Sequence, residues 1–379
     1  MKKVLVITGT RADYGIYFPI LKAIQKDQEL ELQLLVTGMH LSPQYGYTMH
    51  HIEKDGFTIS AKVDCLLQSS THANMAKSIG LAIVGMSQAL ETLSPDCVLV
   101  LGDRGEMLAA AIVATHMNIP LFHLHGGEVS GTIDESVRHA ISKLAHIHLA
   151  ATEGSRERLI KLGEDAWRIH VVGAPRIETM LNTPLPDLEH VKIKYGLTAI
   201  RKYILFVYHP VTTESANITE LKLIIEKLLA TQQDIVCVMP NADAGTDAII
   251  RVYQDYQDTP HFYQITNFEQ LDYLTMLKHT EVLVGNSSSG IIEAASFAIP
   301  VINIGSRQEG RERSANIIDI SESAEQLDQA LQHIFNNSFK QNLNSTDNVY
   351  SQENTSMSII SLFKQFSKSD ELIQKMITY

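Results

Sequence analysis

The sequence predicts an α/β protein of two doubly wound lobes, each with a parallel sheet, that face one another across a cleft. Residues 4–36 read as a strand, a glycine-containing loop, a helix and a second strand, an order typical of doubly wound sheets. Residues 174–200 are rich in proline, and a second series of strands and helices starts at residue 203. A chain of 379 residues also favours two domains over one.

In the first lobe, short apolar runs predict the strands, because the strands of a parallel sheet are buried on both faces. The expected strands are residues 4–8, 30–36, 98–101, 121–124, 148–151 and 169–172. One helix should end near residue 26, others should span 73–93 and 106–117, and a further helix should open at 131–135. Residues 73–93 carry apolar side chains at helical spacing and stop at Ser94-Pro95.

The second lobe repeats this pattern. Its expected strands are residues 203–208, 235–239, 262–264, 281–285 and 300–304, with helices at 219–229 and 268–278. Residues 336–354 are polar and predict a loop, and residues 356–378 predict a helix that crosses back to the first lobe. The expected domains are therefore 1–180 together with 356–378, and 181–355.

Charge and apolar content restrict the class of partner. The formal net charge is −12 and there is no basic run, which argues against a nucleic-acid partner. No stretch approaches the roughly 20 apolar residues of a membrane span. Lys2-Lys3 precede an apolar run that is too short for a signal peptide. We therefore expect a cytoplasmic protein with neither nucleic acid nor membrane as partner.

The cysteines and paired histidines favour ordinary burial over metal binding. Cys65, Cys97 and Cys237 form no CxxC motif, so buried thiols are expected. His123/His125 and His146/His148 alternate along strands, but no third ligand has a clear spacing for zinc. Neutral, hydrogen-bonded histidines are the expectation, and no metal or redox cofactor is implied.

Several charged side chains follow the strands of the first lobe. Asp103 and Arg104 come after strand 98–101, His125 and Glu128 come after strand 121–124, and Asp134 opens the next helix. Ligands bind beyond the carboxyl ends of strands in open α/β sheets, so these side chains could face one crevice. Such a group suits proton transfer beside a bound anion. The alternative is that the acidic residues only cap helices.

Anion binding is predicted at two other loops. Arg11 follows the first strand, where it could meet a phosphate or carboxylate, or else form a surface salt bridge. The first loop is not GxGxxG, so a dinucleotide fingerprint is absent. In the second lobe a strand runs into a serine-rich turn and a helix, with Glu293 and Arg307 nearby; the turn comprises Ser287, Ser288, Ser289 and Gly290. Helix N-termini and hydroxyls attract phosphate, although plain serine capping is the alternative.

Motifs along nearly the whole chain resemble one family. They are GTRADYG (9–15), VTGMHLS (36–42), LGDRGE (101–106), the run from HLHGGE to HIHL (123–149), HPVTTE (209–214), PNADAG (240–245), GNSSSG (285–290) and GSRQEGR (305–311). In order and content they resemble the hydrolysing UDP-N-acetylglucosamine 2-epimerases, sialic-acid-pathway branch, close to the UDP-N,N′-diacetylbacillosamine 2-epimerases of legionaminic acid synthesis. The resemblance implies a GT-B fold of two Rossmann-like lobes with the nucleotide sugar between them.

The resemblance also implies a reaction and a set of residue roles. UDP is eliminated across C1–C2 of UDP-N-acetylglucosamine to give 2-acetamidoglucal, and water then adds to yield N-acetylmannosamine. Asp103 and Asp134 match catalytic carboxylates, and His209 matches a histidine near the diphosphate. Positions that match UDP contacts are Arg11, Asn241, Ser287, Ser288, Glu293 and Arg307, while Arg104 and Gly127 match positions that line the site.

The chain departs from the family pattern at one position and leaves several alternatives open. Many members read HxEGGE, whereas this chain has His125 in place of the first glutamate, so either His125 or Glu128 takes that role. The alternative substrate is UDP-N,N′-diacetylbacillosamine. The rival functions are a GT-B glycosyltransferase and a non-catalytic nucleotide-sugar sensor. The resemblance further suggests a homodimer or homotetramer.

Overall fold

The chain divides into two compact units. The computed structural model describes residues 1–43, 46–67, 71–129, 133–211, 217–240, 246–335, 339, 343 and 347–378, without the side chains of His72, Ile133 and Asp134. Unit 1 comprises Met1–Thr179 and Tyr350–Tyr379, and unit 2 comprises Met180–Val349.

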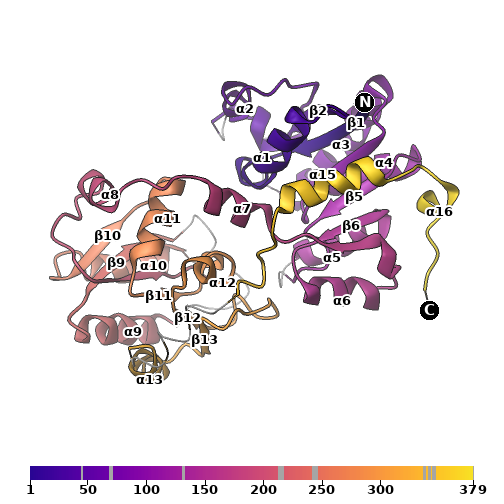
Figure 1. Ribbon diagram of the computed structural model, residues 1–379. Helices are drawn as coiled ribbons and strands as arrows, with labels where there is room; N and C mark the ends of the chain where they lie inside the picture. The colour runs from indigo at the N-terminus through magenta and orange to yellow at the C-terminus, as the bar shows by residue number, and fades with distance from the viewer. Residues whose placement is uncertain are drawn as a thin grey trace. The chain divides into compact units, whose positions relative to one another are not determined.

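Unit 1 is built on a parallel sheet. Its described strands are β1 (Lys2–Thr8), β2 (Leu30–Thr37), β3 (Ala61–Val63), β4 (Cys97–Leu101), β5 (Leu121–Leu124), β6 (Ile147–Ala150) and β7 (Ile169–Val171). They lie in the order β3-β2-β1-β4-β5-β6-β7, and each neighbouring pair runs parallel. Figure 1 labels β1, β2, β5 and β6 of this sheet. Every residue of β4 and β5 is buried, as expected for strands covered on both faces.

Helices cover both faces of this sheet. The described helices of unit 1 are α1 (Arg11–Lys26), α2 (Met49–Lys54), α3 (His72–Leu93), α4 (Gly105–His116), α5 (Ile133–Leu144), α6 (Glu153–Lys161), α15 (Thr355–Gln365) and α16 (Asp370–Ile373), with the 3₁₀ turns η1 (Gly38–Leu41) and η3 (Ala166–Arg168). Helix α7 (Pro175–Asn182) spans the boundary between the units. One core contains Tyr17 of α1 and Phe363 of α15, and the other contains Met86 of α3 and Ala110 of α4. Unit 1 is therefore a three-layer α/β structure.

Unit 2 repeats the architecture. Its described strands are β8 (Tyr203–Val207), β9 (Asp234–Val238), β10 (Phe262–Ile265), β11 (Val282–Gly285), β12 (Val301–Ile304) and β13 (Ile317–Ile320). They pair in parallel in the order β10-β9-β8-β11-β12-β13. The helices are α8 (Leu188–Lys194), α9 (Ile218–Ala230), α10 (Thr246–Gln254), α11 (Gln270–His279), α12 (Ser288–Ile292), α13 (Ala324–Ile334) and the 3₁₀ turn η4 (Ala294–Phe297). Two parallel sheets flanked by helices confirm the predicted α/β class.

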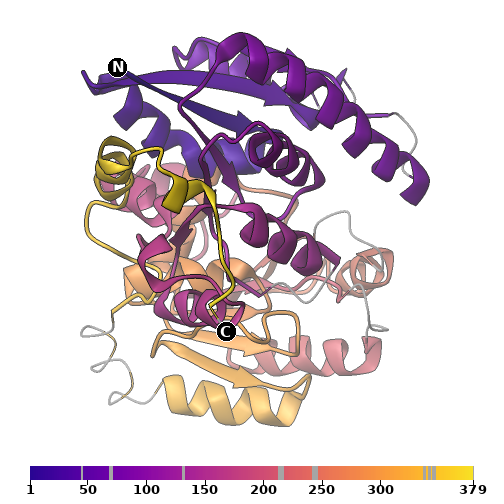
Figure 2. The same ribbon diagram turned by 90° about the vertical axis from the view of Figure 1, so that its right-hand side faces the viewer.

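The last part of the chain returns to unit 1. Figures 1 and 2 both draw α15 and α16, in yellow, against elements of unit 1. The expected single helix over 356–378 is two helices. The Lys2 ammonium donates to the carbonyl oxygen of Lys364 at 2.6 Å and so caps the end of α15. The Ser369 hydroxyl accepts from the Leu372 N–H and starts α16.

The cysteines and helices of the described part show two further features. Cys65, Cys97 and Cys237 are free and buried, and burial raises the pKa of the Cys97 and Cys237 thiols. Within the described residues, no helix combines the length and apolar character that crossing a membrane requires.

Candidate active site

The strand order of each sheet reverses at a central pair of strands. This pair is β1 and β4 in unit 1, and β8 and β11 in unit 2. The connections leave such a pair in opposite directions, which opens a crevice beyond the carboxyl ends of the strands. Arg11, Arg104, His209 and Ser287 lie in the loops that follow these four strands. These loops are therefore the places in each unit that are best suited to hold a ligand.

A buried carboxylate, Asp13, fixes the loop after β1. It accepts hydrogen bonds from the N–H groups of Gly9 (3.0 Å) and Thr10 (2.9 Å) and from the Thr8 hydroxyl (2.8 Å). The Thr10 hydroxyl accepts from the Asp13 N–H at 3.2 Å, which completes a capping box at the start of α1. The box sets the backbone around Arg11, whose side chain is exposed to solvent at the first position of the helix.

Arg104 is the cation at the end of β4. Its Nη2 lies 3.2 Å from Oε1 of Glu106. Burial lowers the pKa of Arg104, but Glu106 and two more distant aspartates offset that effect, so the pKa rises above its ordinary value. A Cβ on Gly38 would lie 2.7 Å from the same Glu106 oxygen, and Gly38 has a φ of +57°. Glycine at residue 38 thus lets Glu106 approach the loop and hold Arg104 there.

The central feature of unit 1 is a chain of polar contacts, two ion pairs and one hydrogen bond, that we call the Arg138 cluster: Asp103, Arg138, Glu128 and His125. The Arg138 guanidinium, on α5, pairs with Asp103 through Nη2 and with Glu128 through Nη1 at 3.4 Å. Oε1 of Glu128 lies 2.9 Å from Nδ1 of His125. Arg138 is 5% exposed, so two carboxylates share one nearly buried cation.

Glu128 sets the proton arrangement of His125. A carboxylate only accepts hydrogen bonds, so Nδ1 of His125 is the donor, and Nε2 of the neutral ring carries the lone pair. Among the described residues Nε2 has no hydrogen-bond partner although it is buried. His125 is not the end of a regular strand, as its alternation with His123 suggested, because β5 stops at Leu124 and His125 has a left-handed φ of +63°.

Two glycines let the turn after β5 pack closely. A Cβ on Gly127, which has a φ of +76°, would lie 2.3 Å from the carbonyl oxygen of Ser155. A Cβ on Gly126 would lie 2.9 Å from Nδ1 of His123. Side chains at either residue would displace the turn and, with it, Glu128.

His123 joins the turn after β4 to α5. Its Nε2 donates to the carbonyl oxygen of Gly102 at 2.7 Å, and its Nδ1 accepts from the Ser142 hydroxyl at 3.2 Å. Burial lowers the pKa of His123 to about 3, so the ring is neutral with its proton on Nε2. Since Asp103 follows Gly102 directly, His123 fixes the backbone beside that carboxylate.

In unit 2, Asn286 ties the ends of the two central strands together. The His209 N–H donates to Oδ1 of Asn286 at 2.7 Å, and Nδ2 of Asn286 donates to the His209 carbonyl at 2.8 Å. The carbonyl oxygen of Asn286 accepts from Arg307 (3.0 Å) and Gln308 (2.9 Å). Asn286 is 1% exposed. It thereby fixes His209 and Arg307 beside the same crevice.

The serine-rich turn after β11 caps a short helix. Ser287 is the N-cap of α12, and its hydroxyl accepts from the Ser289 N–H. The Ser289 hydroxyl is buried and bonds to Tyr273 and Ser287, whereas Ser288 is exposed. The capping alternative therefore describes Ser287, and Ser288 is the serine of the turn that is open to a ligand. Helix α12 ends at Ile292, so the buried Glu293 is its C-cap.

Glycines also shape this turn. A Cβ on Gly285 would lie 2.0 Å from the carbonyl oxygen of Val207, and one on Gly290 would lie 2.9 Å from the Val301 side chain. The backbone of the turn is thus held against β8 and β12.

The structure connects some of the predicted residues and leaves others apart. Asp103, Glu128 and His125 are joined through Arg138, while Arg104 pairs with Glu106 instead. Asn241 and the side chain of Asp134 lie outside the described part of the structure. Within that part, no three His, Cys, Asp or Glu side chains are grouped as a metal site requires.

Sequence reasoning missed Arg138, Asn286 and Asp13. The Thr10-x-x-Asp13 capping box is readable from sequence. Arg138 was hidden because an arginine inside an amphipathic helix normally faces solvent. Nothing in the local sequence shows that Asn286 bonds a backbone far away along the chain.

Comparisons with known proteins identify relatives along nearly the whole chain. Residues 22–364 match the sequence model of a family described as UDP-N-acetylglucosamine 2-epimerase. The chain is 45% identical over 321 residues to the UDP-N,N′-diacetylbacillosamine 2-epimerase (hydrolyzing) of Legionella pneumophila, which covers 84% of this chain and 85% of that protein. It is 37% identical over 333 residues to the UDP-N-acetylglucosamine 2-epimerase of Neisseria meningitidis serogroup B, with 88% and 87% covered.

A solved structure shares the fold. The crystal structure of UDP-GlcNAc 2-epimerase from Neisseria meningitidis bound to UDP-GlcNAc superposes with a TM-score of 0.79 at 19% identity, over 96% of this chain and 100% of that one. The GT-B fold that the motifs implied is the fold of this structure.

Proposed function

Because the chain belongs to the UDP-N-acetylglucosamine 2-epimerase family, we propose that it hydrolyses UDP-N,N′-diacetylbacillosamine with inversion at C2 of the sugar. Membership confirms the family that the motifs indicated. The chain is a hydrolysing 2-epimerase of nucleotide sugars, and the proposal concerns which sugar it takes and which residues act on it.

The sequence identities to two relatives support UDP-N,N′-diacetylbacillosamine as the substrate. The Legionella protein that bears this activity in its name is 45% identical to the chain, against 37% for the Neisseria enzyme named for UDP-N-acetylglucosamine. UDP-N-acetylglucosamine, the first expectation from the sequence, is the second candidate. The two sugars differ at C4 and C6, away from the C1 and C2 atoms that react, so one mechanism serves both.

The observation that carries the mechanism is the Arg138 cluster. Elimination breaks the C2–H bond and the C1–O bond, forms the C1=C2 double bond, and releases UDP with the bonding electron pair. The C2 proton needs a base, and Nε2 of His125 has a lone pair because Glu128 holds the proton on Nδ1. Hydration then returns a proton to C2 from the opposite face and joins the hydroxyl of water to C1, while the remaining proton of that water passes to a base.

The remaining roles rest on the motif positions that these residues occupy. We assign proton transfer during hydration to Asp103 and Asp134, and orientation of His125 to Glu128. The Arg104 cation and the Gly127 turn line the sugar site. Positive or hydrogen-bonding groups suited to the UDP diphosphate and ribose are Arg11, His209, Asn241, Ser287, Ser288, Ser289, Gly290, Glu293 and Arg307.

An acceptor-free incubation tests the function and the substrate together. UDP-N,N′-diacetylbacillosamine and UDP-N-acetylglucosamine are supplied separately in D₂O, and the sugars are followed by proton NMR. We expect free UDP and a C2-inverted sugar with deuterium at C2 from the bacillosamine donor. Turnover of UDP-N-acetylglucosamine alone would select the second candidate. Bound but unchanged donors would instead favour a transferase that needs an acceptor, or a sensor.

The assignment of His125 makes a second prediction. His125→Gln removes the base, and Asp103→Asn removes an acid–base carboxylate, so each should lower kcat by about 10²–10⁴-fold. His50→Gln is the matched control, because His50 forms the same kind of pair with Glu53 (3.2 Å) but is 67% exposed. Near-normal turnover of His125→Gln would remove His125 from the mechanism and leave Glu128 as the base.

We further propose an oligomeric state and a cellular location for the protein. The exposed apolar side chains Met75, Leu81 and Val84 on α3 support a homodimer or homotetramer, acting in the cytoplasm where UDP-sugars are made. Light scattering of the purified protein tests the oligomeric state.

A further inference from the structure

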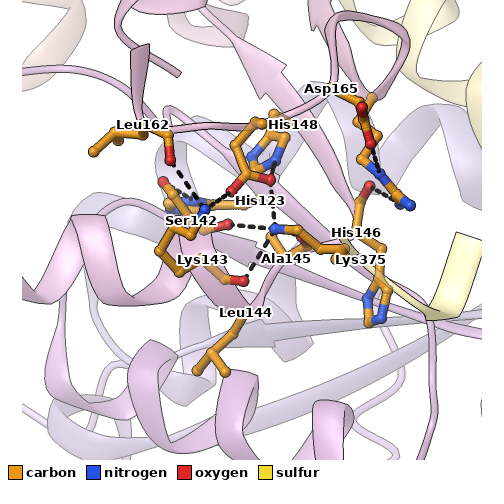
Figure 3. Close-up of polar contacts among 12 residues, drawn as sticks. His123, Ser142, Lys143, Leu144, Ala145, His146, His148, Leu162, Asp165 and Lys375 are labelled. Atoms are coloured by element: carbon orange, nitrogen blue, oxygen red, sulfur yellow. Dashed lines mark hydrogen bonds and ion pairs between the residues drawn. The ribbon is translucent and has the colours of Figure 1, made fainter. Parts of the chain in front are cut away.

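The C-terminal segment of the chain is bonded to the helix that carries Arg138. The Lys375 ammonium donates to the carbonyl oxygens of Ser142 (3.2 Å), Lys143 (3.0 Å) and Ala145 (2.7 Å) (Figure 3). These carbonyls lie at the end of α5, where the last groups of a helix have no partner within the helix. Lys375 is thus a cationic cap on α5, supplied from 230 or more residues away along the chain.

A buried acid holds this lysine in place. Glu164 is 1% exposed and pairs with Lys375, with Lys143 at 2.8 Å and with Nε2 of His148 at 2.9 Å. Burial alone would raise the pKa of Glu164, but the hydrogen bonds from His148 and the two lysines hold it at about 2. The carboxylate is therefore ionised, and Lys375 is one of its counter-ions.

A second anchor fixes the segment just before Lys375. Arg168 is 2% exposed, and its guanidinium donates to the carbonyl oxygens of Leu372 (2.9 Å) and His146 (3.2 Å) and to that of Glu371. Two separate cations therefore bind residues 371–375 to the end of α5 and the start of β6.

The same helix also reaches the candidate site. Ser142 bonds through His123 to the carbonyl of Gly102, and Arg138 pairs with Asp103 and Glu128. Any movement of α5 would shift both connections to the Gly102-Asp103 turn together.

We propose that residues 371–375 are a positioning element of the active site, in which Lys375 holds the end of α5 and thereby keeps Arg138 and Ser142 in place beside Asp103. This inference rests on the proposed function, because it takes Asp103 and His125 as the groups that act on the sugar. Lys375 itself touches no substrate in this scheme.

The test uses the full-length protein with the sugar nucleotide that the wild type turns over. Lys375→Met keeps the length of the side chain and leaves Glu164 paired with Lys143 and His148. We expect kcat to fall by about 10–100-fold, since small misplacement of reacting groups costs this much. The affinity for UDP should stay unchanged, because the proposed UDP contacts lie in unit 2, apart from Arg11, which belongs to α1 and not to α5.

Lys368→Met is the matched control, since Lys368 lies just before residues 371–375 but is exposed, and it should leave kcat unchanged. A purely stabilising role for Lys375 would lower the melting temperature without changing kcat in the temperature range where the variant is folded, and that result would overturn the proposal.

A second variant keeps the proposal testable if Lys375→Met does not fold. Ser142→Ala removes one hydroxyl from the link to His123 and should lower kcat with unchanged UDP affinity. If Ser142→Ala has the same kcat as the wild type, the proposed connection from α5 through His123 to the Gly102-Asp103 turn is overturned. Failure of the wild type to release UDP from either donor would instead contradict the proposed function.

Discussion

Arg138 determines how the acidic side chains of unit 1 are arranged. Its guanidinium lies between Asp103 and Glu128, and Glu128 in turn holds His125. Removing one partner of a buried ion pair leaves uncompensated charge, which costs more than the pair itself contributes. The two carboxylates would repel one another without this cation, so a single side chain keeps both available beside the same crevice.

We therefore predict that Arg138→Met destabilises unit 1 by about 3–5 kcal/mol and removes turnover. Urea unfolding followed by the fluorescence of Trp167, the single tryptophan of the chain, reports on unit 1. Arg156→Met is the comparison, because Arg156 pairs with Glu153 at 3.8 Å on the surface, where a pair contributes about 0–1 kcal/mol. Equal destabilisation by the two variants would show that the Arg138 pairs are worth no more than a surface pair.

At the scale of the elements, the ends of parallel strands are joined by side chains that act on the backbone. Asn286 at the end of β11 bonds both the N–H and the carbonyl of His209 at the end of β8. The side chain of His123 on β5 likewise bonds a backbone group, the carbonyl oxygen of Gly102 in the turn after β4. These contacts therefore fix the backbone of Gly102 and of His209 relative to the strands.

Asn286→Ala should weaken UDP binding about tenfold or more, because it removes the side chain that bonds both backbone groups of His209, at about 1–3 kcal/mol for each hydrogen bond lost. Isothermal titration with UDP measures this. Asn316→Ala is the control: Asn316 is equally buried, and its Nδ2 donates to the Ile299 carbonyl before β12, at the other end of the sheet. If the two variants bind UDP alike, Asn286 does not organise the UDP site.

Element by element, the sequence predicted the central strands well, because β4, β8 and β11 are apolar runs, β1 has the apolar run 4–7, and β5 is apolar except at His123. It did not predict β3 and β13, which form the outer edges of their sheets. β3 is only three residues long, and β13 is partly exposed and interrupted by Asp319. Such edge strands need a neighbouring strand to define them, and a sequence does not show its neighbours.

For the candidate site, the sequence placed Asp103, His125 and Glu128 at adjacent strand ends, because parallel strands end on one edge. It could not predict their connection. Arg138 joins the two carboxylates only after α5 has packed, and His125 contacts Glu128 from a residue with a left-handed backbone. Long-range contacts of this kind leave no local pattern.

At the scale of the whole molecule, several neutral histidines are buried in the interior of unit 1. Burial lowers the pKa of His123 to about 3 and that of His146 to about 4, and it also lowers the pKa of His148. The unfolded chain binds protons at these residues near pH 6.5, whereas the folded chain does not. Their contribution to stability is therefore present above pH 6.5 and is lost as the pH falls toward 4.

Unit 1 should accordingly lose about 2 kcal/mol of stability between pH 7 and pH 5 for each of His123 and His146. Urea unfolding of the protein at pH 7, 6 and 5, followed by the fluorescence of Trp167, measures this loss of stability. His146→Asn offers a matched comparison, since Nδ1 of His146 accepts from the Leu121 N–H and the Asn oxygen can accept likewise without titrating. The variant should lose less stability on acidification than the wild type; an identical pH dependence would contradict this account.

The return of the chain to unit 1 has a consequence for synthesis on the ribosome. The chain leaves unit 1 at Thr179 and re-enters at Tyr350, where the Tyr350 carbonyl accepts from the Ala174 N–H at 2.8 Å. Unit 2 emerges in full before Ile359 and Phe363, which complete the core of unit 1 over α1 and β1. Unit 1 is therefore the first unit to be translated and the last to complete its core. Its apolar surface remains exposed to chaperones while unit 2 folds.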